Sequence, residues 1–247
     1  MRRKTGPRNK AGIASEWDHI CEVRERLIQS GLDYSLTGVT APCIEKYVLQ
    51  YQRDEVVDIG CGSGYLTARI APFCNHITGI DISPHSIELA ARDYSRDNIT
   101  FICNSIQEFS SEKQVDMCIA NMVLMSEPDI RGFLRATQNI LADGGHFLMM
   151  ITHPCFWPRY WGYEKEPWFS YNEELFIAEE FVTSLSPHAM GEITHIHRPL
   201  SQYIQELNAA GLRVKTIDEP YPVGIRPPNY SFDFPRFLFV LAVKGHD

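Results

Sequence analysis

Residues 56–65, Val-Val-Asp-Ile-Gly-Cys-Gly-Ser-Gly-Tyr, decide the fold class of this chain. Residues 56–59 predict a short buried strand, and glycines follow at positions 60, 62 and 64. Glycine permits a tight turn and leaves no Cβ between the backbone and a ligand. A helix pattern begins at Ser63, so the turn directs free backbone N–H groups at whatever binds there. The stretch therefore predicts a strand–turn–helix unit that holds a nucleotide-like ligand.

The spacing of these glycines separates two classes of nucleotide-binding protein. Dinucleotide folds carry G-x-G-x-x-G, in which the third glycine lies three residues after the second. Here it follows after two residues, and Asp58 lies inside the strand just before the turn. The form D-x-G-x-G-x-G resembles the first motif of class I S-adenosylmethionine-dependent methyltransferases. This resemblance implies S-adenosyl-L-methionine as the cofactor, and the spacing argues against an NAD-dependent oxidoreductase.

Asp81 ends the next apolar run, 21 residues after Gly60. A carboxylate at the end of the second strand of a βαβ unit can accept hydrogen bonds from ribose hydroxyls. Alternatively, Asp81 caps the helix that begins near Ser83 and Pro84, since Asp and Ser both cap helices and Pro suits the first turn. Ser83 is the better candidate for the cap, and Asp81 for the ribose.

Apolar runs alternate with helical patterns along most of the chain, which predicts a parallel sheet with right-handed crossovers. Asp143-Gly144-Gly145 is expected to end a helix and form a turn. Strands are predicted at 55–59, 76–81, 98–103, 114–120, 145–152, 212–218 and 236–243. Helices are predicted at 15–30, 40–50, 63–73, 84–94, 127–141 and 198–210, with a short helical turn at 105–109.

The last two strands can pair as a hairpin, which matches the sheet of the family named above. The expected fold is α/β: a Rossmann-like, seven-stranded, mostly parallel sheet with an antiparallel last strand, N-terminal helices and an inserted aromatic cap. Residues 197–212 are also similar to the segment that opens the final helix in methyltransferases of the ubiquinone and menaquinone pathways, which act on small molecules.

Composition limits the class of partner. The chain has 247 residues, 44% hydrophobic and 22% charged, with a net charge of −8. The first ten residues carry five basic side chains and no acid, which leaves about −13 for the rest. Nucleic-acid affinity needs clustered Lys and Arg, so nucleic acid is an unlikely partner. No apolar run is long enough to span a bilayer, and seven scattered cysteines without a CxxC pair suggest reduced thiols in a cytoplasmic protein. The oligomeric state, monomer or homodimer, is left open.

We expect residues 1–12 to be a basic, disordered tail and residues 13–247 to form one methyltransferase domain. Within it, residues 154–196 form a cap insertion. The stretch 153–181 holds ten of the 28 aromatic residues and three of the four tryptophans, which is too apolar for a plain loop. It can cover the carboxyl ends of the strands, where open α/β sheets bind ligands. A satellite core or an interface remains the alternative.

The family resemblance implies roles for particular residues. Gly60, Gly62 and Gly64 pass the methionine part of the cofactor, while Asp58 orders the loop and helps to receive the amino group. Asn104-Ser105 follows the third strand and meets the adenine, although many relatives have an acid there. Asn121-Met122 closes over the reactive end of the cofactor. Nucleic-acid amino methyltransferases often have Asn/Asp-Pro-Pro-Tyr/Phe at this place, whereas this chain has Asn-Met-Val-Leu. The predicted cofactor site is Asp58, Gly60, Cys61, Gly62, Gly64, Asp81, Ile82, Asn104, Ser105, Asn121 and Met122.

The acceptor is expected to be a small molecule held by Trp157, Tyr160 and Trp161 in the cap. His153, at the end of the fifth strand, is the candidate general base, because its pKa range suits proton removal from a hydroxyl or ammonium group. His195 and His197 form H-x-H without an acid or cysteine at ligand spacing, so no metal site is expected. Together these features predict methyl transfer to an oxygen or nitrogen of a small metabolite, with an RNA or protein methyltransferase as the alternative.

Overall fold

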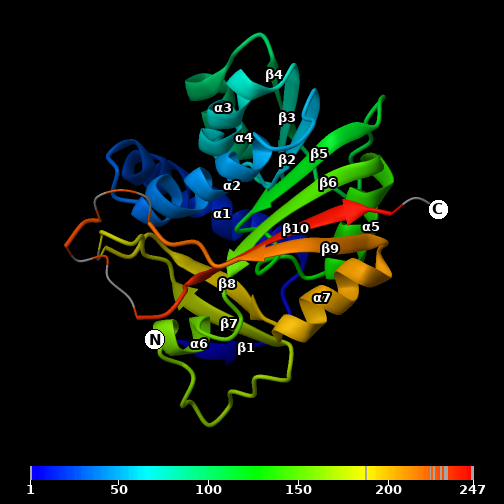
Figure 1. Cartoon of the computed structure of the whole chain (residues 1–247). Coiled ribbons are helices and arrows are strands. Elements are labelled where there is room, and N and C mark those ends of the chain that lie inside the picture. Colours follow the sequence, from blue (N-terminus) through cyan, green and yellow to red (C-terminus); the bar gives the residue numbers. More distant parts are fainter. Residues whose placement is uncertain are drawn as a thin grey trace.

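The computed structural model describes residues 2–186, 188–222, 224, 226–228, 230 and 233–245. Its main feature is a seven-stranded sheet with the order β4-β3-β2-β5-β6-β10-β9 (Figure 1). β10 pairs antiparallel with β6 and with β9, whereas the pairs from β4 to β6 are parallel. This confirms the predicted fold class. The strands are β2 (Glu55–Ile59), β3 (His76–Asp81), β4 (Ile99–Cys103), β5 (Val115–Asn121), β6 (Leu141–Thr152), β9 (Leu212–Asp218) and β10 (Phe237–Lys244).

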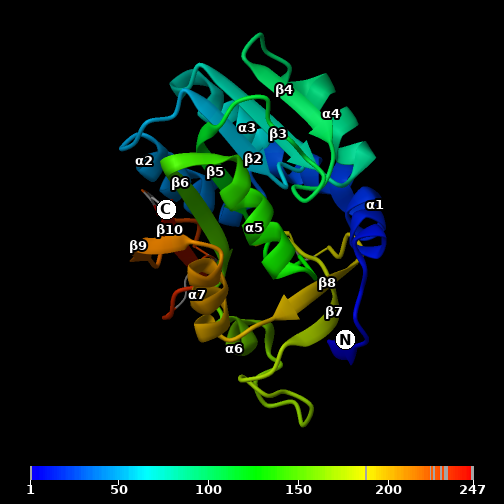
Figure 2. The same cartoon turned by 90° about the vertical axis from the view of Figure 1, so that its right-hand side faces the viewer.

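Helices cover both faces of this sheet, because the strand order runs one way from β2 to β4 and the other way from β5 to β6, and right-handed crossovers then lie on opposite faces. Successive residues of a strand point to opposite faces, so Met117 and Ile119 of β5 pack with the core on the α2 side, and Cys118 and Ala120 with the core on the α5 side. Figure 2 shows α5 and α7 together on one face. The helices are α1 (Lys10–Gln29), α2 (Ala41–Val48), α3 (Tyr65–Ile70), α4 (Pro84–Tyr94), α5 (Ile130–Ile140), α6 (Trp157–Trp161) and α7 (Leu200–Ala209), with a π-helix at Ser35–Thr40 and a 3₁₀ turn at Ala71–Phe73.

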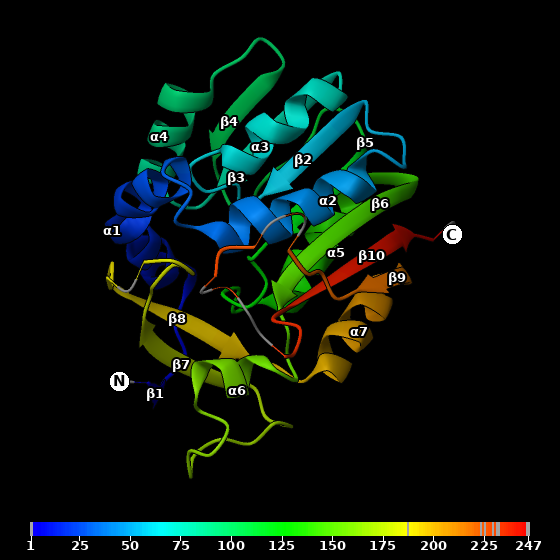
Figure 3. The same ribbon diagram turned by 60° about the vertical axis from the view of Figure 1, so that its left-hand side comes forward.

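A second sheet of three strands is built from β1 (Arg3–Thr5), β7 (Leu175–Glu180) and β8 (Glu192–His197), in the order β1-β7-β8. In Figure 3 it lies below α1, which reaches from β8 to α4. The aromatic stretch 153–181 therefore forms α6 and β7, and β8 follows it; none of these three elements was predicted from the sequence.

The N-terminal segment corrects the expectation of a disordered tail. Arg3, Lys4 and Thr5 pair in register with Ala178, Ile177 and Phe176 of β7. Arg3 also makes two hydrogen bonds to the Glu192 carboxylate, at 2.7 and 2.9 Å. An edge strand of the cap was available to pair with, and such long-range pairing leaves no trace in local composition.

The turn predicted at residues 143–145 is the second difference. β6 begins at Leu141, directly after α5, and Asp143, Gly144 and Gly145 lie within the strand. Gly144 has φ of +74°, and the register with β5 shifts between Val115 and Met117. The glycines thus form an irregularity inside a longer strand, which is a common role for glycine in strands. In the part of the chain that the structure describes, no helix is both long and apolar enough to cross a membrane.

Candidate active site

The glycine turn joins β2 to α3 at the carboxyl end of the sheet. Gly60, Gly62 and Gly64 have φ values of +70°, +54° and +91°, a region that favours glycine. The N–H groups of Gly60 and Cys61 both donate to the Ile80 carbonyl of β3, at 2.7 and 3.0 Å. The three glycines have different surroundings. A Cβ at Gly64 would lie 2.9 Å from Phe101, whereas one at Gly62 would meet only Arg24, at 3.8 Å. Gly64 therefore permits packing, and Gly62 leaves open space above the turn.

Asp58 supports this turn from inside the protein. Its side chain is buried and accepts a hydrogen bond from Thr67 of α3 at 2.6 Å. Burial raises the pKa of Asp58 to about 7, against the hydrogen bond from Thr67, which acts in the opposite direction. Asp58 does not line the main cavity described below but a smaller one, of about 30 Å³, beneath the turn. Its contacts link β2 to α3 and hold the turn between them.

Asp81 connects the turn to the next strand. Its Oδ2 accepts from the Gly62 N–H and its Oδ1 from the Ser83 N–H, both at 2.9 Å. Burial raises the pKa of Asp81, while these two backbone donors and Arg24 favour the ionised form. Ser83 caps α4, because its Oγ accepts from the Ser86 N–H at 3.0 Å. The capping role proposed as the alternative for Asp81 thus belongs to Ser83.

Two polar side chains at the ends of β4 and β5 have atoms that lack a partner. Among the described residues, no hydrogen bond reaches the buried Ser105 Oγ or Asn121 Oδ1. A buried polar atom without a partner costs about 1–3 kcal/mol, which a ligand can offset. The neighbouring Asn104 directs its Oδ1 back to the Ser105 N–H, at 2.8 Å. Met122 has φ of +62°, a conformation that is uncommon outside glycine and is typical of functional sites.

These groups meet in one cavity of about 330 Å³ at the carboxyl ends of the strands. The strand order of the sheet brings these groups together. Because β4, β3, β2 and β5 are parallel and adjacent in that order, their carboxyl ends lie at the same edge of the sheet. Of the predicted cofactor residues, the cavity is lined by Gly60, Gly62, Asp81, Ile82, Asn104, Ser105, Asn121 and Met122. Asp58 and Cys61 lie beside it in the smaller cavity, and Gly64 supports the turn from the protein side.

The cap supplies the other end of the same cavity. Trp157, Tyr160 and Trp161 of α6 all line it, as does Thr152 at the end of β6. His153 points elsewhere: it is absent from the lining, its Nε2 lies 2.8 Å from Glu219 Oε1, and its Nδ1 accepts from the Cys155 N–H at 3.2 Å. Burial lowers the pKa of His153, whereas the hydrogen bond to Glu219 and the charge of that carboxylate raise it. The structure therefore brings the three aromatic residues to the cavity and leaves the proposed base outside its wall.

Several lining residues escaped the sequence analysis because they come from distant segments. Trp17, Cys21 and Arg24 of α1 close the cavity over the glycine turn, and Arg24 also lies 3.4 Å from the Asp33 carboxylate. Further residues come from the cap and from the start of β10: Phe181, Val182, Thr183, Ser184, Ile193, His195, Arg236 and Phe237. His195 belongs to a local sequence pattern, H-x-H. Because no metal-ligand partner lies near this pattern in the sequence, the pattern did not indicate a site.

Glu25 of α1 fixes this helix on the turn, although it carries no recognisable motif. Its buried carboxylate accepts hydrogen bonds from Ser63 Oγ in the turn and from the Tyr94 hydroxyl of α4, the latter at 2.6 Å. Asp18 adds a contact from Ser83 Oγ at the start of α4. The N-terminal helix is therefore part of the site and not a separate element.

Comparisons with known proteins agree with this arrangement. Residues 56–145 match the family model described as a methyltransferase domain. Nodulation protein S of Rhizobium tropici is 32% identical over 96 residues, which cover 37% of this chain and 40% of that protein. A malonyl-[acyl-carrier protein] O-methyltransferase of Acetivibrio thermocellus is 30% identical over 132 residues, 52% of this chain and 45% of that protein. The chain thus spans less than half the length of these curated relatives.

A solved structure is similar over a larger part of the chain. A putative S-adenosylmethionine-dependent methyltransferase from Listeria monocytogenes superposes with a TM-score of 0.66, at 19% identity, over 83% of this chain and 98% of that one. At this identity the likeness concerns the fold. Together these comparisons show what the chain is similar to: residues 56–145 match a methyltransferase domain, and the chain has the fold of this solved methyltransferase.

Proposed function

We propose that this protein transfers a methyl group from S-adenosyl-L-methionine to an oxygen or nitrogen of a small metabolite. The observation that carries the proposal is the single cavity, with the glycine turn and Asp81 at one end and the aromatic residues of α6 at the other. Methyl transfer requires a cofactor and an acceptor in contact, and one continuous cavity allows that. The O-methyltransferase among the relatives supports the same class of reaction.

Seven of the predicted cofactor residues have a specific role in this proposal. Asp81 accepts hydrogen bonds from the ribose hydroxyls, because its carboxylate lines the cavity while the Gly62 and Ser83 N–H groups hold it in place. Ser105 and Asn104 meet the adenine, and the unpartnered Ser105 Oγ supports this assignment. Gly60 and Gly62 bound the methionine part, where a Cβ at Gly62 would meet only Arg24, at 3.8 Å. Asn121 Oδ1 and Met122 border the reactive end.

Methyl transfer requires little from the protein beyond the positioning of the cofactor and the acceptor. When bound, the cofactor supplies a methyl group that is already activated on a sulfonium. The protein residues hold the acceptor in line, exclude water and limit its motion, and such positioning can account for a large part of the rate. Trp157, Tyr160 and Trp161 are the proposed acceptor residues, since their rings line the cavity beyond the cofactor half.

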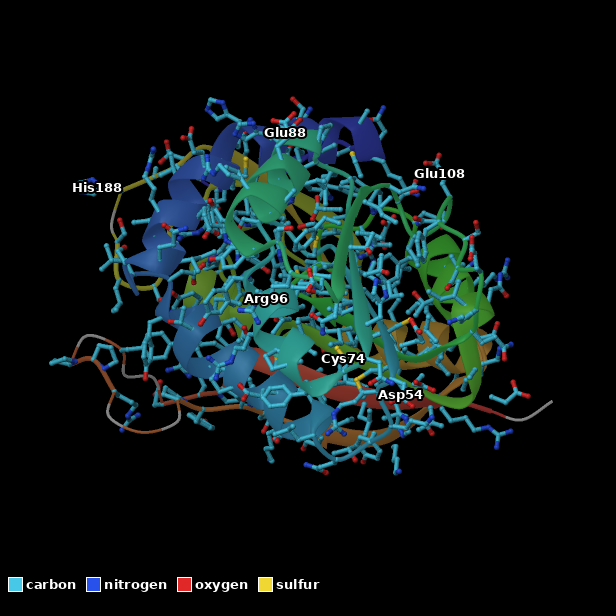
Figure 4. All side chains as sticks on the ribbon, turned by 90° about the horizontal axis from the view of Figure 1, so that it is seen from above. Asp54, Cys74, Glu88, Arg96, Glu108 and His188 are labelled. Atoms are coloured by element: carbon cyan, nitrogen blue, oxygen red, sulfur yellow. The ribbon has the colours of Figure 1, made fainter. Side chains whose placement is uncertain are left out.

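RNA or protein methylation is the second candidate, and the charge distribution argues against the RNA acceptor. The two arginines nearest the N-terminus are paired with carboxylates, Arg2 with Glu179 and Arg3 with Glu192. Seen from above, Asp54, Glu88 and Glu108 project from the molecule (Figure 4), and all three are exposed. A surface with such carboxylates and a net charge of −8 repels a phosphate backbone. We infer a cytoplasmic location from the reduced cysteines that the sequence suggests.

Thermal unfolding with two ligands tests the cofactor. A ligand that binds only the folded state raises the melting temperature, so S-adenosylhomocysteine should raise it and NAD should not. The acceptor is tested by incubating the protein with S-adenosylmethionine, labelled in its methyl group, and a metabolite extract, followed by mass spectrometry of small molecules and of macromolecules. Label in a small molecule supports the proposal. Stabilisation by NAD alone, or label confined to RNA or protein, would contradict it.

A further inference from the structure

The acceptor half of the cavity is bounded by a continuous row of rings. Trp157 lies in the middle, with its ring centroid 4.8 Å from Tyr160, 5.2 Å from Trp161 and 6.2 Å from both His195 and Phe237. All five rings line the cavity, and we call them the ring wall. Aromatic faces and edges at such distances favour a flat, conjugated ligand. His195 and Phe237 both contact Trp157 and therefore lie at most about 12 Å apart.

At one end of the ring wall lies His195, whose imidazole has unused hydrogen-bonding capacity. The residue is 5% exposed, and no described residue makes a hydrogen bond to either ring nitrogen. Burial lowers the pKa of His195 to about 3, with a smaller effect from His197 and Arg198, so the ring is neutral near pH 7. A neutral imidazole offers one donor and one acceptor.

The indole N–H of Trp157, beside His195, also lacks a partner among the described residues. A buried polar group without a partner costs free energy, and native proteins satisfy most such groups. A hydroxyl or amino group of a ligand would satisfy both, because each can donate to the imidazole and accept from the indole N–H. This end of the ring wall therefore fits a polar substituent.

At the other end of the ring wall lies a buried cation. Arg236 is 4% exposed, and its Cζ lies 4.8 Å from the ring centroid of Tyr160 and 5.1 Å from that of Phe237. Its Nη2 donates to the Ser35 hydroxyl at 2.9 Å and to the Tyr230 hydroxyl. These contacts fix the plane of the guanidinium, which remains charged at physiological pH even though burial lowers its pKa. A fixed guanidinium in a cavity wall suits carboxylate or phosphate groups.

The charges around the cavity are compatible with an anionic ligand. The described lining residues include the cations Arg2, Lys10, Arg24 and Arg236 and the carboxylates Asp33, Asp81 and Glu127. Arg2 is paired with Glu179 and Arg24 with Asp33, and the charge of Asp33 also acts on Arg236. The sulfonium of the proposed cofactor adds a further positive charge. This positive charge favours an acceptor with a negative group over a cationic acceptor.

We propose that the acceptor is a planar aromatic acid that lies along the ring wall, with its anionic group at Arg236 and a hydroxyl or amino group at His195. This inference rests on the proposed function and names the substrate class for the same site. It assigns His195 and Arg236 as acceptor-binding residues, a role that neither the glycine motif nor the aromatic composition of the cap gives them.

The test uses three probes of one shape: 6-hydroxy-2-naphthoate, its methyl ester, and 2-naphthoate, which lacks the hydroxyl. Each is titrated by calorimetry into the wild-type protein saturated with S-adenosylhomocysteine. We expect the hydroxy acid to bind at least tenfold more tightly than the ester and at least threefold more tightly than 2-naphthoate. The comparison with the ester measures the contribution of the negative charge, and that with 2-naphthoate measures the contribution of the hydroxyl.

Two variants assign these preferences to residues. Arg236→Met should reduce the preference for acid over ester to less than threefold, and Arg236→Lys should retain part of it. The control is Arg159→Met, because Arg159 lies on α6 but is exposed and outside the cavity. His195→Phe should remove the preference for the hydroxyl, and His197→Phe should not, since His197 lies two residues along β8, outside the lining, and contacts the Tyr171 carbonyl. An unchanged affinity for S-adenosylhomocysteine shows that a variant is folded.

The outcomes separate this inference from the proposed function. If wild-type protein fails to bind S-adenosylhomocysteine, the proposed function is wrong. If it binds S-adenosylhomocysteine, but the ester binds as tightly as the acid or no acid binds at 1 mM, the cofactor assignment stands and the aromatic-acid inference is overturned. The same holds if Arg236→Met binds S-adenosylhomocysteine normally and keeps the full preference for the acid.

Discussion

Asp81→Asn offers a sharp test of the cofactor half of the cavity. In the wild type, one carboxylate oxygen accepts from the Gly62 N–H and the other from the Ser83 N–H, both at 2.9 Å. An asparagine amide has one oxygen and one NH₂ group, so it can keep only one of these two bonds. It also loses the negative charge that the proposed ribose hydroxyls would contact. The substitution preserves the size of the side chain and changes only its hydrogen bonding and charge.

The expected loss follows from the contacts. Charge-assisted hydrogen bonds contribute about 1–3 kcal/mol, so the affinity for S-adenosylhomocysteine should fall roughly 5- to 150-fold. Calorimetric titration measures this directly. Asp116→Asn is the matched control: Asp116 also accepts a backbone N–H, from Glu55 at 3.0 Å, but at the amino end of β5, away from the cavity. Both variants should lose some stability, and only Asp81→Asn should lose affinity.

Equal affinity of Asp81→Asn and wild type, within twofold, would refute the role of Asp81 in ligand binding. In that case the carboxylate only supports the glycine turn. A comparable loss in Asp116→Asn would show that the effect arises from general destabilisation of the sheet.

Three further predictions concern the turn and its surroundings. Gly64→Ala should lower the free energy of unfolding, measured in urea, by about 1–3 kcal/mol, because the new Cβ would contact Phe101. Gly62→Ala should weaken S-adenosylhomocysteine binding more than it lowers stability. A larger loss of stability in Gly62→Ala and a larger loss of binding in Gly64→Ala would contradict these roles. Burial raises the pKa of Asp58 to about 7, so the folded state resists ionisation of this carboxyl. As the pH rises from 4 to 8, the free energy of unfolding of wild type should therefore fall by up to about 4 kcal/mol relative to that of Asp58→Asn. Urea unfolding at each pH measures this, and parallel pH profiles of the two proteins would refute it. His153→Ala should reduce methyl transfer less than tenfold, since the ring lies outside the cavity lining; a loss of 10²–10⁴-fold with unchanged cofactor affinity would make it the general base.

The main sheet could be predicted from the sequence because its signals are local. Strand β3 and helix α4 begin and end at the predicted residues, His76–Asp81 and Pro84–Tyr94. An apolar run between turn residues and a Ser-Pro helix start need no information from distant segments. The same holds for the glycine turn, whose motif includes both the strand and the helix that it joins.

The cap could not be predicted in this way. Strand β7 pairs with β8 on one side and with β1 on the other, and neither pairing is encoded by a short turn between the strands. His195 and Arg236 line one cavity although 41 residues separate them, because β8 and the start of β10 both lie beside α6. His153 shows the opposite case. Its place at the end of β6 was predicted correctly, but the direction of the ring depends on Glu219 after β9, which no local pattern reveals.

A crystal structure of the protein with S-adenosylhomocysteine would show directly whether the cofactor binds in this cavity. We expect the ribose hydroxyls within hydrogen-bonding distance of the Asp81 carboxylate, the homocysteine part against Gly60 and Gly62, and the sulfur facing the part of the cavity lined by Trp157. A ligand bound outside this cavity, or with its ribose away from Asp81, would contradict this expectation.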